Sequence, residues 1–322
     1  MHSFEELSQQ FKDRFDINHF PATPASLYDP NNYFLSLGGK RIRPVMCLMG
    51  NELFGDIDPD CWDIATAIEL FHNFTLVHDD IMDAAPLRRG KPTVHEKYGQ
   101  ATALLAGDVM LVVAYDYLNR ISPLHAKKII HLFNKTAREV CEGQQMDMDF
   151  EKQELVGLDE YLQMITLKTS VLLAATLQMG ALLGGAGQRN QHHLYEFGKN
   201  LGIAFQVQDD YLDAFGDPAK FGKQPGGDIV ANKKTFLMIR ALETAAPAAQ
   251  KELRALMNPN PPAGKVEKVL SIFKNCGVDK WAVDIKEKYI DAALSHLEDI
   301  AVISVRKSPL RELATFLVQR QH

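Results

Sequence analysis

The sequence predicts an all-α protein built as a single large helical bundle. Long stretches rich in Leu, Ala, Met, Gln and Glu repeat apolar residues at spacings of three and four, the period of an amphipathic helix. No stretch alternates apolar and polar residues long enough to indicate a strand, so we expect few strands or none. No Gly/Ser-rich linker and no shift in composition divides the 322 residues, so we expect one domain, residues 1–322.

Six long helices are predicted in order, and clusters of proline or glycine separate them. Their ranges are Trp62–Asp83, Thr102–Arg120, His125–Phe150, Leu158–Leu183, His192–Phe215 and Val278–Val305. With the shorter segments between them, we expect roughly ten helices or more. The most apolar run, Val171–Gly187, is interrupted by Gln178, Gly180 and Gly184, so it fits a buried core helix better than a membrane span.

The composition argues against several classes of function. Hydrophobic residues make up 46% and charged residues 24%, the balance of a soluble globular protein with a sizeable core. A net charge of −6 without a basic stripe argues against nucleic acid as a partner, and we expect no stable membrane insertion. Four cysteines without Cys-x-x-Cys pairing argue against a zinc site or a disulfide framework. Together with a polar N-terminus that lacks a signal-peptide core, they favour a cytoplasmic location.

An acidic motif, Asp-Asp-x-x-Asp, occurs twice and is the most informative feature of the chain. One copy is Asp79, Asp80 and Asp83, and the other is Asp209, Asp210 and Asp213, 130 positions later (209 − 79). Each copy follows an apolar stretch and places carboxylates at positions i and i+4, on one face of a helix. A single copy would suit a solvated acidic helix end. Two copies, each followed by basic residues, favour a binding site.

Carboxylates gathered in this way repel one another unless a cation lies between them. Hard cations such as Mg²⁺ take oxygen ligands, commonly one or two carboxylates together with substrate phosphates. Ligand sites in helical bundles are built from side chains on facing helices. We therefore predict that the two copies face each other and hold phosphates bridged by metal ions.

Two basic segments could bind those phosphates. Gly38–Pro44 (GGKRIRP) joins two glycines, which allow close backbone approach, to Lys40 and Arg43. Taken alone, it would equally suit a basic loop that caps a helix. Pro86–Pro92 (PLRRGKP) begins just after the first acidic copy, and guanidinium groups beside carboxylates are what a metal–diphosphate site requires. The alternative is an exposed loop that neutralises the nearby acids.

Other polar residues interrupt predicted helices. Gly143–Asp147 (GQQMD) lies within one helix, and Lys168 and Thr169 lie within another that is otherwise apolar. A buried lysine is costly unless it is paired, so we expect Lys168 to meet an anion rather than to extend to the surface.

A glycine-rich segment, Gly222–Asp228 (GKQPGGD), follows the second acidic copy, and Lys233-Lys234-Thr235 comes shortly after. A flexible segment of this kind that carries lysine could close over bound phosphates as a lid. A plain surface loop remains the alternative, above all for Lys234.

Phe74 and Phe71 lie five and eight residues before Asp79 on one side of the same predicted helix. Such a pair is usually ordinary core, but here it would also lie beneath the metal site.

Together these segments resemble the trans-isoprenyl diphosphate synthase family (polyprenyl synthetases). The resemblance rests on GGKRIRP, LVHDDIMDAAPLRRGKPTVH, GQQMD, KT, FQVQDDYLD and GKQPGGDI, which occur in the family's order between Gly38 and Lys234. It implies an all-α fold of the isoprenoid synthase type with a deep central cavity, and a homodimer. It also implies Mg²⁺-dependent head-to-tail condensation of isopentenyl diphosphate with allylic prenyl diphosphates, with three Mg²⁺ ions for which Mn²⁺ could substitute.

The resemblance also assigns roles to residues of this sequence. Asp79, Asp83 and Asp209 would be the metal ligands, supported by Asp80, Asp210 and Asp213. Arg88, Lys168, Lys223 and Lys233 would hold the allylic diphosphate, and Lys40, Arg43, His72 and Arg89 would hold isopentenyl diphosphate. Thr169 and Gln206 would face the developing cation, and Gln144 of GQQMD is a further substrate-binding candidate. The departing diphosphate is itself a plausible proton acceptor, so no protein base is required.

Two departures from the family's farnesyl synthases bear on product length. The first acidic copy lacks the two-residue insertion of the usual bacterial farnesyl synthases. Thr75 stands where animal and fungal farnesyl synthases carry an aromatic residue. A small residue at position 75 implies a deeper pocket, with Phe74 as its floor and Phe71 beneath. FTLVHDDIMD is similar to archaeal-type geranylgeranyl synthases, so we expect geranylgeranyl diphosphate as the main product. Farnesyl diphosphate or a longer polyprenyl diphosphate is the alternative.

Two rival functions are less compatible with the motifs. Terpene cyclases share the fold and the first acidic motif, but usually replace the second and lack a GGKRIRP-type segment. A non-catalytic subunit of a heteromeric synthase would carry degenerate motifs, whereas all six aspartates are intact here.

Overall fold

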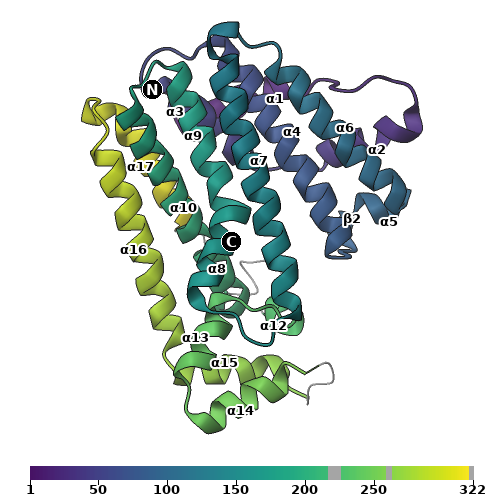
Figure 1. Cartoon of the computed structure of the whole chain (residues 1–322), viewed down its shortest axis with the longest axis vertical. Coiled ribbons are helices and arrows are strands. Elements are labelled where there is room, and N and C mark those ends of the chain that lie inside the picture. The colour runs from purple at the N-terminus through teal and green to yellow at the C-terminus, as the bar shows by residue number, and fades with distance from the viewer. Residues whose placement is uncertain (217–225, 259–262, 319–322) are drawn as a thin grey trace. The chain divides into compact units, whose positions relative to one another are not determined.

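The computed structural model describes residues 1–216, 226–258 and 263–318, and these are folded almost entirely into helices (Figure 1). The predicted all-α class is confirmed. The strands in the described part of the chain form one two-stranded hairpin.

The elements follow one another as a series of helices joined by short connections. They are α1 (Phe4–Phe15), α2 (Ala25–Ser36), α3 (Ile42–Glu52), α4 (Pro59–Met82), β1 (Leu87–Arg88), β2 (Lys91–Pro92), α5 (Val94–Tyr98), α6 (Gln100–Leu118), α7 (Pro123–Lys152), α8 (Leu158–Ile165), the π-helical turn η1 (Thr166–Ser170), α9 (Val171–Leu183), α10 (Gln188–Phe215), α12 (Gly227–Val230), α13 (Phe236–Thr244), α14 (Pro247–Leu256), α15 (Lys265–Asn275), α16 (Val278–Glu298) and α17 (Ser304–Val318).

The chain divides into two compact units. The first comprises residues 1–133 and 176–191, and the second comprises residues 134–175 and 192–322. The boundaries fall within α7, α9 and α10, so each of these helices contributes to both units. The single domain expected from the sequence stays a prediction.

The first unit is organised around α4, which packs along α6 and α3. Glycines on α9 bring its backbone against α3, because a Cβ at Gly180 would overlap the carbonyl group of Cys47. The buried residues of α9 confirm that the apolar run after Val171 is a core helix. This packing holds the N-terminus of α3 and the C-terminal turns of α4, which carry two of the predicted segments.

The second unit carries the other acidic copy on α10. A Cβ at Gly202 would lie 2.8 Å from Ser170 Cα, so glycine lets α10 approach the η1 turn closely. The sequence predicts one uninterrupted helix over Leu158–Leu183, but the structure contains a π-helical turn at Thr166–Ser170. Such turns are frequent at functional sites, and this one carries Lys168 and Thr169.

The prediction of one helix over Val278–Val305 is wrong at its C-terminal end. α16 ends at Glu298, and α17 begins at Ser304. The end of α16 is stabilised by Lys307, a buried lysine whose Nζ donates to the Glu298 carbonyl oxygen at 2.6 Å. Helical periodicity alone does not reveal a capping interaction from a later helix.

Two helical stretches of the described residues are long and apolar enough to cross a membrane by length and composition alone. One is α6, whose most apolar window is 44% buried, and the other is Leu158–Leu183, whose window is 72% buried. Core helices of soluble proteins pass the same test, so these helices are weak evidence for a membrane span. The exposed residues of α6 include Leu104, Leu105 and Val112.

Candidate active site

A cavity in the second unit brings together several of the predicted site residues. Its volume is about 420 Å³. It is lined by Asp147, Tyr161, Met164, Ile165, Lys168, Thr169, Gln206, Asp209, Asp210, Asp213, Asp228, Lys233, Lys234 and Thr235. Carboxylates from α7, α10 and α12 therefore face one space together with three lysines, an arrangement suited to metal ions and phosphates.

Gly143 determines how closely α7 approaches the wall of this cavity. A Cβ at Gly143 would overlap the backbone of Leu167 and Lys168, so only glycine permits the contact. One turn later on α7, Asp147 reaches Lys168, and Asp147 Oδ2 lies 2.5 Å from Lys168 Nζ. The prediction that Lys168 meets an anion is confirmed.

Asp210, the middle carboxylate of the second acidic copy, is held by two neutral donors. The Tyr161 hydroxyl donates to Asp210 Oδ2, and Gln206 Nε2 donates to Oδ1 at 3.0 Å. Burial raises the pKa of Asp210 to about 7, although the hydrogen bond from Tyr161 acts in the opposite direction. Asp210 therefore lacks a cationic partner among the side chains to which it is hydrogen-bonded.

Asp213 accepts two hydrogen bonds from the segment that begins at Gly226. Its Oδ2 accepts the backbone N–H of Asp228 at 3.0 Å, and its carbonyl oxygen accepts the N–H of Gly226 at 2.6 Å. Gly226 has φ +91°, a left-handed conformation that glycine adopts without strain. Burial raises the pKa of Asp228, while Lys233, whose Nζ lies 3.7 Å from Asp228 Oδ1, lowers it.

Lys234 has a structural contact that the sequence did not reveal. Its Nζ donates to the carbonyl oxygen of Phe150 at 2.5 Å and also to that of Gln153. These carbonyls lie at the C-terminal end of α7, where backbone acceptors lack helical partners. Lys234 therefore fastens the chain after α12 to the end of α7 and lines the cavity as well.

In the first unit, the middle carboxylate of the other acidic copy has a charged partner. Arg88 Nε and NH2 donate to the two oxygens of Asp80, each at 2.8 Å. Arg88 is placed by the hairpin β1–β2, whose turn consists of Arg89 at φ 52° and Gly90 at φ 74°. Positive φ at both positions is typical of the two-residue turns that match strand twist. Arg88 was predicted to hold the allylic diphosphate, and here it is engaged by Asp80.

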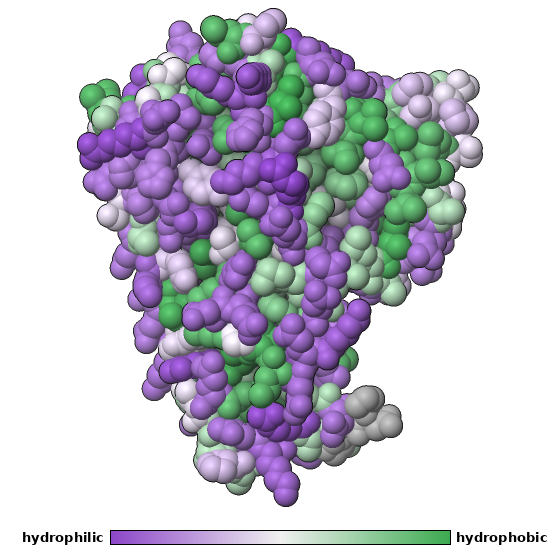
Figure 2. Space-filling model, viewed as in Figure 1, coloured by the Kyte–Doolittle hydropathy of each residue, from purple (hydrophilic) through white to green (hydrophobic). Residues whose placement is uncertain are grey.

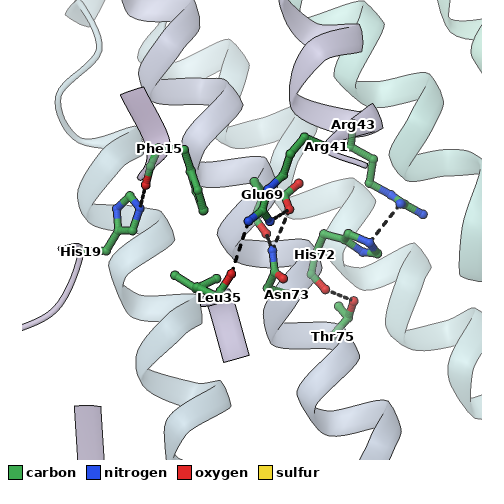
Figure 3. Close-up of polar contacts among 9 residues, drawn as sticks. All are labelled: Phe15, His19, Leu35, Arg41, Arg43, Glu69, His72, Asn73 and Thr75. Atoms are coloured by element: carbon green, nitrogen blue, oxygen red, sulfur yellow. Dashed lines mark hydrogen bonds and ion pairs between the residues drawn. The ribbon is translucent and has the colours of Figure 1, made fainter. Parts of the chain in front are cut away.

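Arg43 and His72, both predicted to hold isopentenyl diphosphate, lie in contact (Figure 3). Arg43 NH1 lies 3.0 Å from His72 Nε2. Because guanidinium only donates, His72 must accept at Nε2 and carry its proton on Nδ1. Burial, and then the charges of Arg43, Arg88, Arg89 and Arg41, hold the pKa of His72 well below its usual value. His72 is therefore neutral, and Arg43 keeps its charge although burial lowers its pKa to about 10.

Arg41, Glu69 and Asn73 form a buried group beside that pair (Figure 3). Arg41 NH1 forms an ion pair with Glu69 Oε1, which also accepts from Asn73 Nδ2 at 2.9 Å. The guanidinium of Arg41 also lies 4.7 Å from the centre of the Phe15 ring. Arg41 thus anchors α3 to α4. Its neighbours Lys40, which is exposed, and Arg43 are the residues predicted to bind substrate.

Arg89 lies against the glycine pair of the GGKRIRP segment. A Cβ at Gly39 would come within 3.1 Å of Arg89 NH2, so the absence of a side chain at Gly39 makes room for the guanidinium. Arg89, which follows α4, therefore lies beside the glycine pair that precedes α3. The charges of Arg43 and Arg89 both lower the pKa of His72, so these three residues lie in one basic region of the first unit. Their role in binding isopentenyl diphosphate stays a prediction.

The predicted product-length residues lie on one side of α4. The rings of Phe71 and Phe74 are 5.7 Å apart between centroids, and Phe74 lies 4.7 Å from His78. Phe71 is fully buried against Phe133, at 5.2 Å. Thr75 turns its hydroxyl back to the carbonyl oxygen of His72 at 2.8 Å. Their role in product length stays a prediction.

Some predicted site residues lie elsewhere. Lys223 falls outside the described residues, as does most of the predicted lid. Gln144 is buried on α7 and does not line the cavity. Asp79 and Asp83 lie in the first unit and Asp209 in the second, so the facing of the two acidic copies stays a prediction.

Three residues of these networks were missed as site residues in the sequence. Glu69 carried a signal, because a carboxylate within an apolar helix requires a partner. Asp147 also carried a sequence signal, because it lies one turn after Gly143 on the same face of the helix. Tyr161 carried none: its partner Asp210 is 49 residues away in sequence, and nothing local joins them.

Comparison with known proteins gives consistent matches over nearly the whole chain. The family model described as polyprenyl synthetase matches residues 24–274. A geranylgeranyl diphosphate synthase of Methanosarcina mazei is 36% identical over 301 residues, which cover 93% of this chain and 91% of that protein. A crystal structure of a geranylgeranyl pyrophosphate synthase is 44% identical, covers 100% of both chains and has a TM-score of 0.94.

A further structure holds a metal ion and a diphosphate. It is a polyprenyl synthase of Caulobacter crescentus CB15 complexed with calcium and isoprenyl diphosphate, and it is 27% identical with a TM-score of 0.86. The match covers 99% of this chain and 98% of that chain. With the motifs, the helical fold and the acidic cavity, these matches show that the chain belongs to the polyprenyl synthetase family.

Proposed function

We propose that this protein is a short-chain trans-prenyltransferase that condenses isopentenyl diphosphate head-to-tail with allylic prenyl diphosphates. The observation that carries the proposal is the cavity of the second unit. There the second acidic copy lines the same space as Lys168, Thr169 and Gln206. A site that ionises a diphosphate must hold metal-bound oxygens beside groups that tolerate a carbocation, and this lining offers both.

The donor set suits a hard divalent cation such as Mg²⁺. The cavity presents five carboxylates, and its described lining contains no thiol or imidazole. No three acidic, histidine or cysteine side chains of the described residues form a complete metal site by themselves. Water and substrate phosphate would complete the coordination of such an ion. Asp79, Asp83 and Asp209 are the proposed direct ligands of three Mg²⁺ ions, for which Mn²⁺ could substitute.

The metal ions would stabilise the negative charge of the departing diphosphate. Lys168 would approach the same diphosphate while Asp147 holds its ammonium group in place. Arg43, hydrogen-bonded to a neutral His72, keeps free donors for the second diphosphate. Because the established contacts of Arg88 are with Asp80, its role would be shared between that carboxylate and the allylic diphosphate.

We expect geranylgeranyl diphosphate as the main product, with farnesyl diphosphate or a longer product as the alternative. Proteins named for the geranylgeranyl product are similar to this chain over nearly its whole length. Thr75 is small, and the next aromatic side chains on α4 are Phe74 and Phe71. These two positions are separated by about 4.5 Å along the helix axis, close to the length of one isoprene unit.

A homodimer in the cytoplasm is the proposed state of the protein. The exposed face of α6 carries Leu104, Leu105 and Val112, and hydrophobic side chains gather in the region of Figure 2 where Figure 1 places α6. An exposed apolar face of this kind is typical of an interface with another protein. Light scattering of the chain and of Val112→Lys would test it, since the substituted chain should be monomeric.

One assay tests the proposed function most directly. The purified chain is incubated with isopentenyl diphosphate, Mg²⁺ and each allylic starter in turn, and the products are identified by mass. We expect a prenyl diphosphate of twenty carbons as the main product, and none in the presence of excess chelator. A cyclised hydrocarbon instead of a longer diphosphate would indicate a terpene cyclase, and no turnover by the chain alone would indicate a non-catalytic subunit.

A further inference from the structure

Tyr161 is the one aromatic side chain in the described lining of the cavity, and the proposed reaction gives it no role. It lies on α8 and is almost fully buried. Its hydroxyl donates to Asp210 Oδ2, and its ring lies 6.3 Å from that of Phe236. The ring packing and the hydrogen bond are separate contributions, because the Tyr161→Phe substitution removes only the second.

Asp210 connects Tyr161 to Gln206. Its two oxygens accept from different residues: Oδ2 from Tyr161 and Oδ1 from Gln206 Nε2 at 3.0 Å. Gln206 and Asp210 are one turn apart on α10, whereas Tyr161 reaches Asp210 from α8. Two donors on opposite oxygens fix the plane of a buried carboxylate, because rotation would break both hydrogen bonds.

The orientation of the Gln206 amide follows from this arrangement. Gln206 Nε2 donates to Asp210 Oδ1 at 3.0 Å, so the amide turns its NH₂ group toward Asp210 and its carbonyl oxygen away from it. Thr169 on η1 supports the same orientation, since its hydroxyl donates to Gln206 Oε1 at 3.5 Å. That distance is long for a hydrogen bond, so Asp210 provides the stronger constraint.

The orientation matters because Gln206 lines the cavity in which a carbocation is proposed to form. An amide oxygen carries partial negative charge and stabilises a nearby cation, whereas an NH₂ group in the same place would destabilise it. The amide is useful to the reaction only in one of its two orientations.

We propose that Tyr161 is a positioning residue of the active site, acting through Asp210 to hold the Gln206 carbonyl oxygen toward the reacting cation. The inference rests on the proposed function and adds to it a residue outside the acidic and basic motifs. Loss of the hydroxyl should slow the chemical step while leaving the binding of either diphosphate unchanged.

The test is a double-mutant cycle with Tyr161→Phe and Gln206→Met. The Gln206→Met substitution removes the amide while keeping the side-chain volume. Tyr161→Phe should lower kcat about tenfold, in the range found when a supporting group behind a catalytic group is removed. KM for both substrates should stay within about twofold of the parent value, because only a transition-state interaction is lost. The double variant should be no slower than Gln206→Met alone, since Tyr161 acts through Gln206.

Tyr195→Phe is the matched control, because it removes a phenolic hydroxyl from a half-buried tyrosine of the same unit, outside the cavity. Its kcat should equal that of the parent protein. Three results would each overturn the inference. The first is a loss of kcat in the double variant equal to the product of the two single losses, and the second is a rise in KM without a fall in kcat for Tyr161→Phe. The third is a fall in kcat for Tyr195→Phe as large as that for Tyr161→Phe.

A stability measurement separates this inference from the proposed function. If the parent chain makes no prenyl diphosphate, the proposed function fails and the positioning role fails with it. If the parent chain is active, urea unfolding of Tyr161→Phe, Asp210→Asn and the double variant tests the contact itself. Tyr161→Phe should destabilise the Asp210→Asn protein less than it destabilises the parent chain, and equal losses in the two backgrounds would show that the contact is absent.

Discussion

The two acidic copies have the same spacing, and their middle carboxylates are both buried, with Asp80 2% and Asp210 5% exposed. Their partners differ in charge. Asp80 accepts two hydrogen bonds from the guanidinium of Arg88, at Nε and NH2. Asp210 instead accepts from the neutral side chains of Tyr161 and Gln206. A repeated motif therefore does not imply a repeated environment, because the partners come from different parts of the fold.

The difference has an electrostatic consequence. The charge of Asp80 is compensated within the first unit by a permanent cation. In the second unit, burial raises the pKa of Asp210 to about 7, and Asp209, Asp213 and Asp228 line the same cavity. Lys168 is already engaged by Asp147. The described lining of the cavity holds five carboxylates and three lysines, an excess of acidic groups whose charge bound divalent cations would neutralise.

The largest expected effect comes from removing a proposed metal ligand from either copy. Asp79→Ala and Asp209→Ala should each lower turnover by more than about a hundredfold, corresponding to about 3 kcal/mol of lost transition-state stabilisation. Circular dichroism should show that both variants remain folded. Full activity in one variant would mean that only the other copy holds catalytic metal.

The charge difference between the copies can be tested by replacing each middle carboxylate with its neutral isostere. Asp80→Asn should destabilise the fold by about 2 kcal/mol, because it removes the anionic partner of Arg88. Asp210→Asn should be neutral or stabilising at pH 8, because neither described hydrogen-bond partner of Asp210 is a cation and a buried charge is removed.

Both variants are compared by urea unfolding in the presence of chelator, with Asp291→Asn as an exposed control. Equal destabilisation by Asp80→Asn and Asp210→Asn would show that the two environments are alike after all.

The basic residues of the first unit should separate into two groups. Arg43→Ala should raise KM for isopentenyl diphosphate by about tenfold with less effect on the allylic substrate, because it removes binding at one diphosphate only. Arg88→Ala should do the reverse. Steady-state kinetics with each substrate varied in turn measures both. The same pattern in the two variants would mean that one site has been interpreted as two.

The smallest expected change is in product length, and it should follow from the helix before the first copy. Phe74→Ala should lengthen the main product by one isoprene unit, because it removes the predicted floor, and adding Phe71→Ala should lengthen it again. Phe205→Ala, which removes an aromatic side chain four residues before Asp209 in the second copy, should not lengthen it. If Phe74→Ala leaves the product distribution unchanged in mass analysis, the floor lies elsewhere, for example on residues 158–183.

Much of the fold followed from local sequence. The long helices were predicted within a few residues of their observed ends, because amphipathic periodicity and proline or glycine boundaries are local signals. The exceptions involve contacts between elements. α16 ends early where Lys307 caps it, and the π-helical turn at Thr166–Ser170 lies against glycines of α7 and α10.

The active-site predictions divide in the same way. The Arg88 contact could be anticipated, since it lies eight residues from Asp80 and a short hairpin returns it to the carboxylate. The contact of Tyr161 with Asp210 could not, because a tyrosine in an apolar helix is compatible with ordinary core packing.

The sequence by itself determined the helical class, the position of each carboxylate on its helix face and the family, since these depend on residue spacing along one chain. Only the tertiary structure decided which carboxylate meets a cation and which meets neutral donors. Spacing along a helix sets the direction in which a side chain points. Whether a carboxylate is neutralised depends on the charged or neutral groups that contact it from other helices. For Asp210 those groups include Tyr161, which packing alone brings to the second acidic copy.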